Sequence, residues 1–298
     1  MCDLLVALPA ATGGPTLFAK NSDRPPTERQ VLEWLPPRVD DGPLRTTHVA
    51  IDPHPADTLG VLGSRPTWGW GLEHGVNEAG VAAGNATIYT TLDPRTVPDA
   101  LTGMDLVRLA LERAATAQDG VAVIERLLTV VGQGGSGHDG ARRPYWSSFL
   151  LADPGRAFVV ETSGNELAVE EVDRARAISN RTTIPAFDAA HRHPEQPVEV
   201  LVDPRWRASQ HVLAQEPVTV DSLQEHLASH VGGDGGWTVC MHVDTPAHQE
   251  STNASLVAEL PVEGAPVAHV VAGSPCTARW FRIAIDPPSD GVWELNLT

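Results

Sequence analysis

The sequence predicts an α+β protein in which antiparallel sheets stack on one another and carry helices on their outer sides. Three patterns support this fold class: two apolar runs around a turn-rich segment at the start of the chain, two pairs of amphipathic helices, and many short apolar runs separated by turns. Neither a repeat nor a linker divides the 298 residues, so we expect one domain over 1–298.

The first strands are expected at the start of the chain. Residues 2–8 (CDLLVAL) and the later run TLFAKN flank the turn-rich PAATGGP, which predicts a strand, a loop and a returning strand. Prolines are frequent over residues 25–70, which favours surface loops with short strands near 31–34 and 47–51. Residues 71–89 then predict two short buried strands joined by a tight NEAG turn.

Helical periodicity occurs in two pairs of segments. Residues 104–118 and 121–131 each keep their apolar side chains on one face, and a glycine-rich segment ends this pair. Residues 205–215 and 221–231 form the second pair, with Asp221 as the expected N-cap of its second helix.

The remaining segments are typical of strands. Residues 146–179 alternate apolar runs with turns, which predicts an antiparallel β-meander. After the second helical pair, strands are expected near 237–242, 253–260, 267–272, 279–285 and 292–297.

Charge and hydropathy exclude several kinds of partner. The chain has 38 acidic and 21 basic side chains, a formal net charge of −17, and its longest basic run is the pair Arg142 and Arg143. Nucleic acids and anionic membrane surfaces are therefore disfavoured. No apolar stretch is long enough to span a membrane and no signal-peptide pattern follows Met1, so we expect a cytoplasmic protein.

Metal and cofactor signals are weak. Cys2, Cys240 and Cys276 are widely spaced and odd in number, which predicts neither a disulfide framework nor a zinc site and favours a reducing compartment. The pairs His191 with His193 and His242 with His248 lack a supporting ligand pattern, so no metal is expected. The segment GQGGSG fits GxGxxG but lacks the strand–turn–helix context of a dinucleotide site.

Cys2 is the strongest chemical signal. Removal of Met1 would leave a thiol and a free α-amine on one residue, and unperturbed groups of these kinds have pKa values of about 8.5 and about 8. The amine can then accept the proton of its own thiol, directly or through water, and return it to a leaving group. The alternative interpretation is a small hydrophobic side chain that only packs.

The second strand adds charge beside Cys2. Because paired strands lie about 5 Å apart, a returning strand brings Lys20, Asn21 and Asp23 next to the terminal strand. A cation there favours a thiolate, and a carboxylate can orient the α-amine. The structural alternatives are a strand-edge lysine whose ammonium reaches solvent and an aspartate that caps a turn.

At this point the order of motifs resembles that of secernins and of the bacterial peptidase C69 dipeptidases, which are N-terminal-nucleophile hydrolases. The resemblance is carried by CDLLVALPAAT, FAKNSDRPPTERQ, GVNEAGVAAGN, SSFLLADPGRAFVVETSG, AISNRTTI, TVCMH, NASLVAELP and GSPCTARWF. It implies an αββα sandwich of two stacked antiparallel sheets between helix layers.

The resemblance also implies site residues. In the wider group, which includes bile salt hydrolases and penicillin V acylases, the terminal cysteine is the nucleophile, and this matches Cys2. The group's FGRNxD signature falls on residues 18–23, so Lys20 replaces its arginine and Asp23 is its aspartate.

Two asparagines and a late arginine complete the implied site. Asn85 in AGN matches the end of the group's second motif, and Asn180 in ISN matches the oxyanion-hole asparagine. Asn180 closes the apolar run ARAISN, from which its amide can donate a hydrogen bond to an oxyanion; for both asparagines the alternative is turn chemistry. The late catalytic arginine corresponds to Arg279 in TARWF, with Arg282 as its neighbour.

The expected activity is cleavage of a small peptide or amide through a Cys2 thioester, most simply as a dipeptidase. The alternatives are an acylase or acyltransferase for a non-peptide amide and a non-catalytic, secernin-like binding protein. This chemistry requires neither a metal nor an organic cofactor. While Met1 is attached, the nitrogen of residue 2 is an amide that cannot act as a base, so we expect an inactive precursor. A homo-oligomer is left open.

Overall fold

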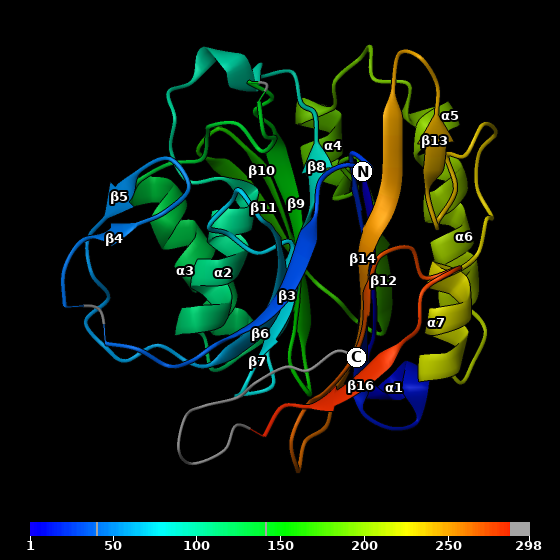
Figure 1. The fold of residues 1–298 in the computed structure, drawn as a ribbon, viewed down its shortest axis with the longest axis horizontal. Coiled ribbons are helices and arrows are strands. Elements are labelled where there is room, and N and C mark those ends of the chain that lie inside the picture. Colours follow the sequence, from blue (N-terminus) through cyan, green and yellow to red (C-terminus); the bar gives the residue numbers. More distant parts are fainter. Residues whose placement is uncertain (40, 141, 287–298) are drawn as a thin grey trace.

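Two antiparallel sheets stack face to face between two layers of helices in the computed structural model, which describes residues 1–39, 41–140 and 142–286 (Figure 1). This is the αββα sandwich that the sequence predicts. The expected strand at 292–297 lies outside the described residues. Within the described residues, no helix is both long and apolar enough to cross a membrane.

The first sheet is built around the terminal strand. Its order is β12 (Ala175–Ile178), β1 (Cys2–Ala7), β2 (Thr16–Arg24), β14 (Gln249–Leu260), β15 (Val267–Ala272) and β16 (Phe281–Ala284), with β13 (His242–Asp244) paired to β14. The first turn of the chain contains the short helix α1 (Pro9–Thr12). Because β1 has a partner on each side, the terminal strand is held inside the sheet and not at its edge.

The second sheet holds most of the middle of the chain. Its order is β11 (Glu166–Glu171), β10 (Ala157–Ser163), β9 (Trp146–Ala152), β8 (Ala82–Ile88), β7 (His74–Asn77), β6 (Val61–Pro66) and β3 (Gln30–Leu35). The predicted NEAG turn joins β7 to β8, and Gly80 in it has a φ of +86°, which only glycine adopts without strain. A small separate hairpin consists of β4 (Leu44–Arg45) and β5 (Ala50–Ile51).

Helices cover the outer face of each sheet. On the second sheet lie α2 (Gly103–Arg113) and α3 (Ala117–Val130), and on the first lie α6 (Asp203–Leu213) and α7 (Val220–Leu227), with α4 (Pro185–His191) and α5 (Val198–Leu201) nearby (Figure 1). A 3₁₀ turn, η1 (Pro94–Thr96), precedes α2. The first two long helices begin with capping boxes, at Thr102 and Thr116.

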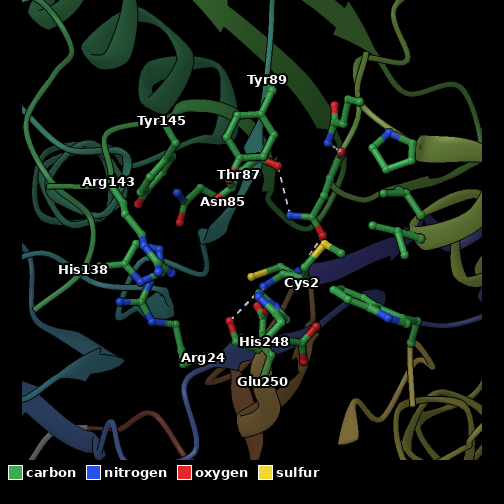
Figure 2. A pocket seen from close by; sticks show the side chains of 18 of the residues that line it. Cys2, Arg24, Asn85, Thr87, Tyr89, His138, Arg143, Tyr145, His248 and Glu250 are labelled. Atoms are coloured by element: carbon green, nitrogen blue, oxygen red, sulfur yellow. Dashed lines mark hydrogen bonds and ion pairs between the residues drawn. The ribbon is translucent and has the colours of Figure 1, made fainter. Parts of the chain in front are cut away.

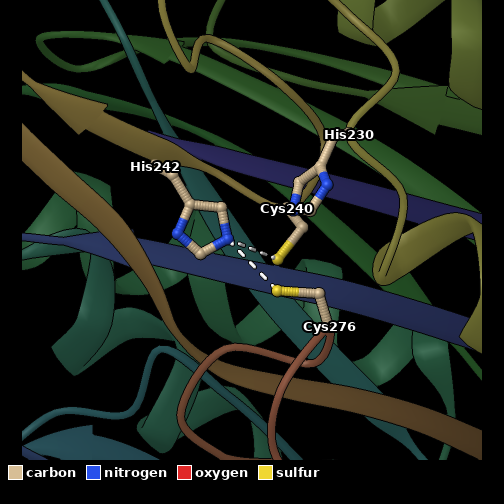
Figure 3. A group of neighbouring side chains, drawn as sticks. All are labelled: His230, Cys240, His242 and Cys276. Carbon is tan, nitrogen blue, oxygen red and sulfur yellow. Dashed lines mark hydrogen bonds between the residues drawn. The ribbon is translucent and has the colours of Figure 1, made fainter.

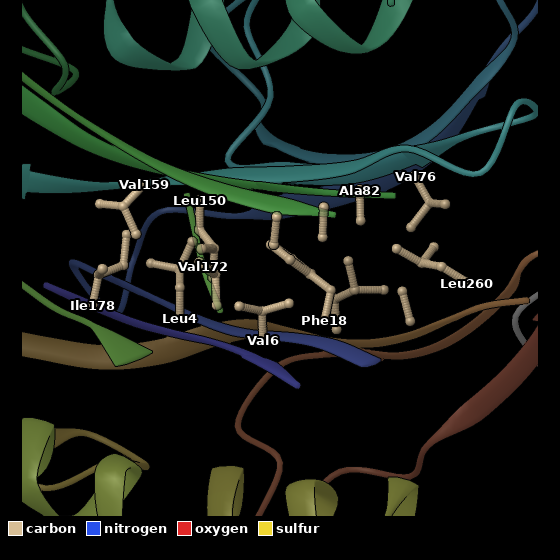
Figure 4. Close-up of a cluster of buried hydrophobic side chains, with 14 of the residues drawn as sticks. Leu4, Val6, Phe18, Val76, Ala82, Leu150, Val159, Val172, Ile178 and Leu260 are labelled. Carbon is tan, nitrogen blue, oxygen red and sulfur yellow. The ribbon is translucent and has the colours of Figure 1, made fainter. Parts of the chain in front are cut away.

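Alternation along β1 divides its side chains between two cores. Leu4 and Val6 pack between the sheets, where Figure 4 shows them facing side chains of the second sheet such as Leu150. Leu5 and Ala7 point the other way, into the core beneath α6 and α7. Both faces of β1 are therefore buried, and the even-numbered positions lie between the sheets. Cys2 belongs to that even-numbered series.

The sequence expectations fail at several boundaries. The fourth strand of the predicted meander, β12, leaves it and pairs with β1 of the other sheet, which carries Asn180 across. The strand β6 was missed because Gly63 and Pro66 made the segment look like loop, yet Val61 and Leu62 are buried.

Two expectations near α7 were wrong. The N-cap of α7 is Thr219, which accepts a hydrogen bond from Ser222, and Asp221 lies in the first turn. The strand expected at 237–242 is mostly an irregular loop followed by β13, because its backbone groups bond to the 229–236 segment instead of to a sheet.

Candidate active site

Cys2 lies at the floor of a cavity of about 400 Å³ at one end of the two sheets (Figure 2). Strand register explains its surroundings: Cys2 is paired with Ser22 and Leu4 with Lys20, so these side chains share the face between the sheets. Cys2 is 6% exposed and Lys20 is fully buried. The predicted nucleophile and the predicted cation are thus brought together.

Lys20 contacts the thiol directly. Its Nζ lies 3.4 Å from Sγ of Cys2 and donates to Oγ of Ser22 at 2.7 Å and to Oε2 of Glu73 at 3.3 Å. Ser22 is in turn 3.1 Å from Nδ1 of His74, whose pKa burial and Lys20 lower to about 3. The imidazole is therefore neutral, and Lys20 carries the charge next to the sulfur.

The charge on Lys20 is secured by its anionic neighbours. Burial alone would lower the pKa of Lys20, but its interactions with Cys2 and Glu73 outweigh burial and raise it. Burial likewise opposes ionisation of Glu73, and Lys20 with Arg24 overcomes it and lowers the pKa of that carboxyl. Arg24 Nη1 lies 3.3 Å from Glu73, so two buried cations flank this carboxylate. Neither Glu73 nor Arg24 was among the site residues expected from the sequence.

Asn180 holds the backbone nitrogen of Cys2. Its Oδ1 accepts from Cys2 N at 2.8 Å, and its Nδ2 donates to the carbonyl of Thr87 at 2.9 Å. These two partners define the orientation of the amide, because one is a donor and the other an acceptor. Asn180 therefore lies within hydrogen-bonding reach of the group that becomes the α-amine once Met1 is removed.

Met1 occupies part of the cavity. Its ammonium donates to the carbonyl of Asp23 at 3.0 Å and forms an ion pair with the carboxylate of Glu250. Burial lowers the pKa of this ammonium. The cavity thus already binds one primary amine of a peptide chain at Glu250, a residue that the sequence did not single out.

Asp23 is buried on the opposite face of β2. Its Oδ1 accepts from Thr252 at 2.6 Å, whereas its Oδ2 lies 3.8 Å from Arg205 and has no hydrogen-bond partner among the described residues. Burial raises the pKa of Asp23 to about 6, although the terminal ammonium and Arg205 oppose the rise. A buried acceptor without a partner, next to the chain terminus, is suited to receive a further N–H.

Arg205 was not expected in the site. It projects from α6, is fully buried, forms an ion pair with Asp3 and donates to Oδ1 of Asn180 at 3.2 Å. The sequence held a signal for it: Arg205, Ser209 and Val212 are spaced four and three apart and share the buried face of the helix. An arginine on such a face requires a buried partner.

Of the two remaining predicted residues, one lies in the site and the other does not. Asn85 is 2% exposed, lines the cavity beside Tyr145 and donates weakly to Ser147 at 3.4 Å. Arg279 is not brought to the site, because it is exposed and its guanidinium lies over the ring of Phe281.

Charges of both signs line the cavity on different sides of Cys2. Arg24 and Arg143 lie on one side together with His138, whose pKa burial and Arg24 lower to about 3, while Glu250 and His248 lie on another (Figure 2). Apolar and aromatic side chains complete the wall, among them Tyr89, Tyr145, Pro197, Leu201, Val202 and Trp237.

The wide sequence spacing of the two other cysteines predicted that they would lie apart, but the structure brings them together. Cys240 and Cys276 converge with His230 and His242 outside the cavity. His248, which had been weighed with His242 as a metal ligand, instead pairs with Glu250 at 2.7 Å.

Nearly the whole chain aligns with solved structures of similar fold. A variant of conjugated bile acid hydrolase from Clostridium perfringens aligns over 96% of this chain and 92% of its own, with 13% identity and a TM-score of 0.58. Penicillin V acylase from Agrobacterium tumefaciens aligns over 95% and 86%, with 16% identity and a TM-score of 0.59. No known family model matches the chain. At such identities the similarity establishes the fold.

Proposed function

We propose that this chain is an N-terminal-cysteine amidohydrolase of the secernin and C69 dipeptidase type, which cleaves small peptides through a thioester on Cys2. One observation carries the proposal: at the floor of the cavity, the thiol of Cys2 lies 3.4 Å from a buried lysine ammonium while its backbone nitrogen is held by Asn180 at 2.8 Å. A thiol that only packs would need no buried ammonium beside it.

The proposed reaction begins with removal of Met1, which turns the amide nitrogen of Cys2 into a primary amine. The α-amine takes the proton of the Cys2 thiol, and the thiolate attacks the substrate carbonyl carbon while the carbonyl electrons move to oxygen. The α-ammonium then protonates the leaving nitrogen as the C–N bond breaks, leaving a thioester. Water gives a proton to the α-amine as it attacks this thioester, the C–S bond breaks, the acid product leaves, and the α-ammonium returns its proton to the Cys2 thiolate.

Each neighbouring group has a role in this scheme. Lys20 stabilises the thiolate, and Asp23 offers its unpartnered Oδ2 to the new α-ammonium. Asn180 uses one amide hydrogen on Thr87, which leaves the other for the oxyanion. Loss of one such donor typically costs about 3 kcal/mol of transition-state stabilisation. Asn85 is proposed as the second donor from the cavity wall.

The charge distribution supports a dipeptide as substrate. Glu250, which pairs with the ammonium of Met1, is proposed to receive the substrate's α-ammonium once Met1 has left. Arg143, at the other side of the cavity, is proposed to attract the terminal carboxylate. Cations and an anion on separate sides of the nucleophile match a short zwitterion better than a long apolar acyl chain.

The test compares the processed wild-type chain with Cys2→Ala on a panel of dipeptides. We expect hydrolysis by the wild type and none by the variant, with matching circular dichroism spectra. N-acetylated and C-amidated forms of the best dipeptide should each be cleaved more slowly. Equal activity in the wild type and the variant would exclude Cys2 as the nucleophile, and a preference for doubly blocked amides would point to an acylase.

The two alternatives have their own signatures. An acyltransferase would convert a competing amine into a new amide, which mass spectrometry of the products detects. A binding protein without turnover would leave Cys2 unlabelled by a thiol-reactive amide analogue, even after Met1 has been removed.

A further inference from the structure

A second group of reactive side chains lies outside the cavity. This thiol–imidazole cluster consists of His230, Cys240, His242 and Cys276. Figure 3 shows the four side chains pointing toward one another from three segments of the chain: the loop after α7, the start of β13 and the loop between β15 and β16. Each residue offers one potential ligand atom, and these four atoms all lie within 4.8 Å of one another.

The distances fit a single tetrahedral metal ion. Nε2 of His242 lies 3.4 Å from Sγ of Cys240 and 3.2 Å from Sγ of Cys276. Zinc bonds of about 2.3 Å to sulfur and about 2.0 Å to nitrogen place neighbouring tetrahedral ligands about 3.6 Å apart for nitrogen and sulfur, and about 3.8 Å apart for two sulfurs. Small side-chain adjustments would bring all four atoms to this geometry.

We propose that the thiol–imidazole cluster binds one zinc ion as a structural site. Two thiolates and two imidazoles are a characteristic zinc donor set, and the two thiolate charges neutralise the dication. All four positions are filled by protein, which is the arrangement of structural and not of catalytic zinc. A two-iron cluster would place its imidazoles and thiolates on different metal ions, which disagrees with imidazole–sulfur distances of 3.2 and 3.4 Å.

A disulfide is the main alternative for two adjacent thiols, and the histidines argue against it. A disulfide needs no further ligands, yet two imidazole rings converge on these sulfurs, with ring centroids 5.1 Å apart. A bound dication stabilises thiolates over thiols, so metal binding would displace protons from Cys240 and Cys276.

The proposed ion would brace one wall of the cavity. The loop that carries His230 and Cys240 also carries Trp237, which lines the cavity. Both bridged loops already contact Thr252: Met241 N donates to its hydroxyl and Ser274 Oγ donates to its carbonyl. A metal at the cluster would join these loops side by side across β14. The proposal does not depend on the amidohydrolase activity.

The test uses the full chain purified under reducing conditions, without a polyhistidine tag and without chelators. Metal analysis by mass spectrometry should find about one zinc ion per chain, and Co²⁺ added to the metal-free chain should give the visible bands of tetrahedral cobalt with thiolate ligands. Cys240→Ser and Cys276→Ser should lose both signals. Cys2→Ala is the matched control, because it removes a thiol outside the cluster and should keep the metal.

Two further measurements keep the test decisive if the serine variants fail to fold. Cobalt titration of the wild type needs no variant, and His230→Ala alters only an exposed ligand, with the exposed His211→Ala as its control. His230→Ala should weaken cobalt binding at least tenfold, and His211→Ala should not. The proposal is overturned if reduced wild-type protein shows no tetrahedral cobalt spectrum, or if the native protein contains a Cys240–Cys276 disulfide and no metal.

Discussion

Replacing Asp23 with asparagine should stabilise the fold at neutral pH while it removes activity. The carboxylate is 2% exposed, and only one of its oxygens has a hydrogen-bond partner, the hydroxyl of Thr252. Asparagine retains that acceptor and removes a buried negative charge. The proposed mechanism needs the charge to hold the α-ammonium, so stability and activity should change in opposite directions.

The size of the effect follows from the raised pKa of Asp23. Burial moves this pKa from 3.8 to about 6, and one pKa unit corresponds to about 1.4 kcal/mol, so the change amounts to about 3 kcal/mol. The native state therefore binds more protons than the unfolded state between these two values. The stabilising contribution of this group is full below pH 3.8 and is lost as the pH rises through about 6.

Asparagine does not titrate, so the comparison isolates this group. The free energy of unfolding of Asp23→Asn, relative to that of the wild type, should rise by about 3 kcal/mol between about pH 4 and about pH 8. Urea unfolding at both pH values measures it, with intact mass confirming that both proteins have the same N-terminus. The exposed Asp57→Asn should change by less than about 0.5 kcal/mol. A difference independent of pH would refute the reasoning.

Three further substitutions test other parts of the site. Lys20→Met should abolish hydrolysis and lower the free energy of unfolding by about 3 kcal/mol, because Glu73 loses one of its two buried cations. Lys20→Arg should reduce activity only slightly if charge near the thiolate is all that matters. Unchanged activity in Lys20→Met would contradict the role assigned to Lys20. Glu250→Gln should raise KM for free dipeptides at least tenfold and leave KM for N-acetylated ones unchanged, which steady-state kinetics with both substrates measures. Arg279→Ala should alter kcat/KM less than twofold because the side chain is exposed and outside the cavity; a large loss would restore it as a catalytic residue.

The contact between Lys20 and Cys2 was predictable because it depends on local geometry alone. β1 and β2 follow each other in the chain and return antiparallel, and alternation then determines which side chains of the pair share a face. The same reasoning could not predict which strands from distant parts of the chain pair with β1. Asn180 reaches Cys2 only because β12 leaves the meander and pairs with β1, and no periodicity in the sequence marks that exchange.

The site residues that the sequence did not indicate are charged side chains whose partners are distant in the sequence. Glu73 precedes β7, and Arg205 lies on the buried face of α6, so each meets its partners only through tertiary packing. The same limit applies to the thiol–imidazole cluster. Cys240 and Cys276 are too far apart in sequence for a ligand pattern, and the loops that join them acquire their shape from the sheet between them.

The position of the terminal strand links the folding of the chain to the removal of Met1. β1 precedes all of its partners in the sequence, yet it pairs with β12 and with β2, whose other neighbour is β14, more than two hundred residues later in the chain. Long-range pairing of this kind is slow, so the terminus stays accessible while the rest of the chain is made. In the folded chain Met1 is partly buried in the cavity, where its ammonium pairs with Glu250 and donates to the carbonyl of Asp23. Under the proposed mechanism, a chain that folds with Met1 attached has no free amine on Cys2 and is inactive, so removal of Met1 is expected to compete with folding.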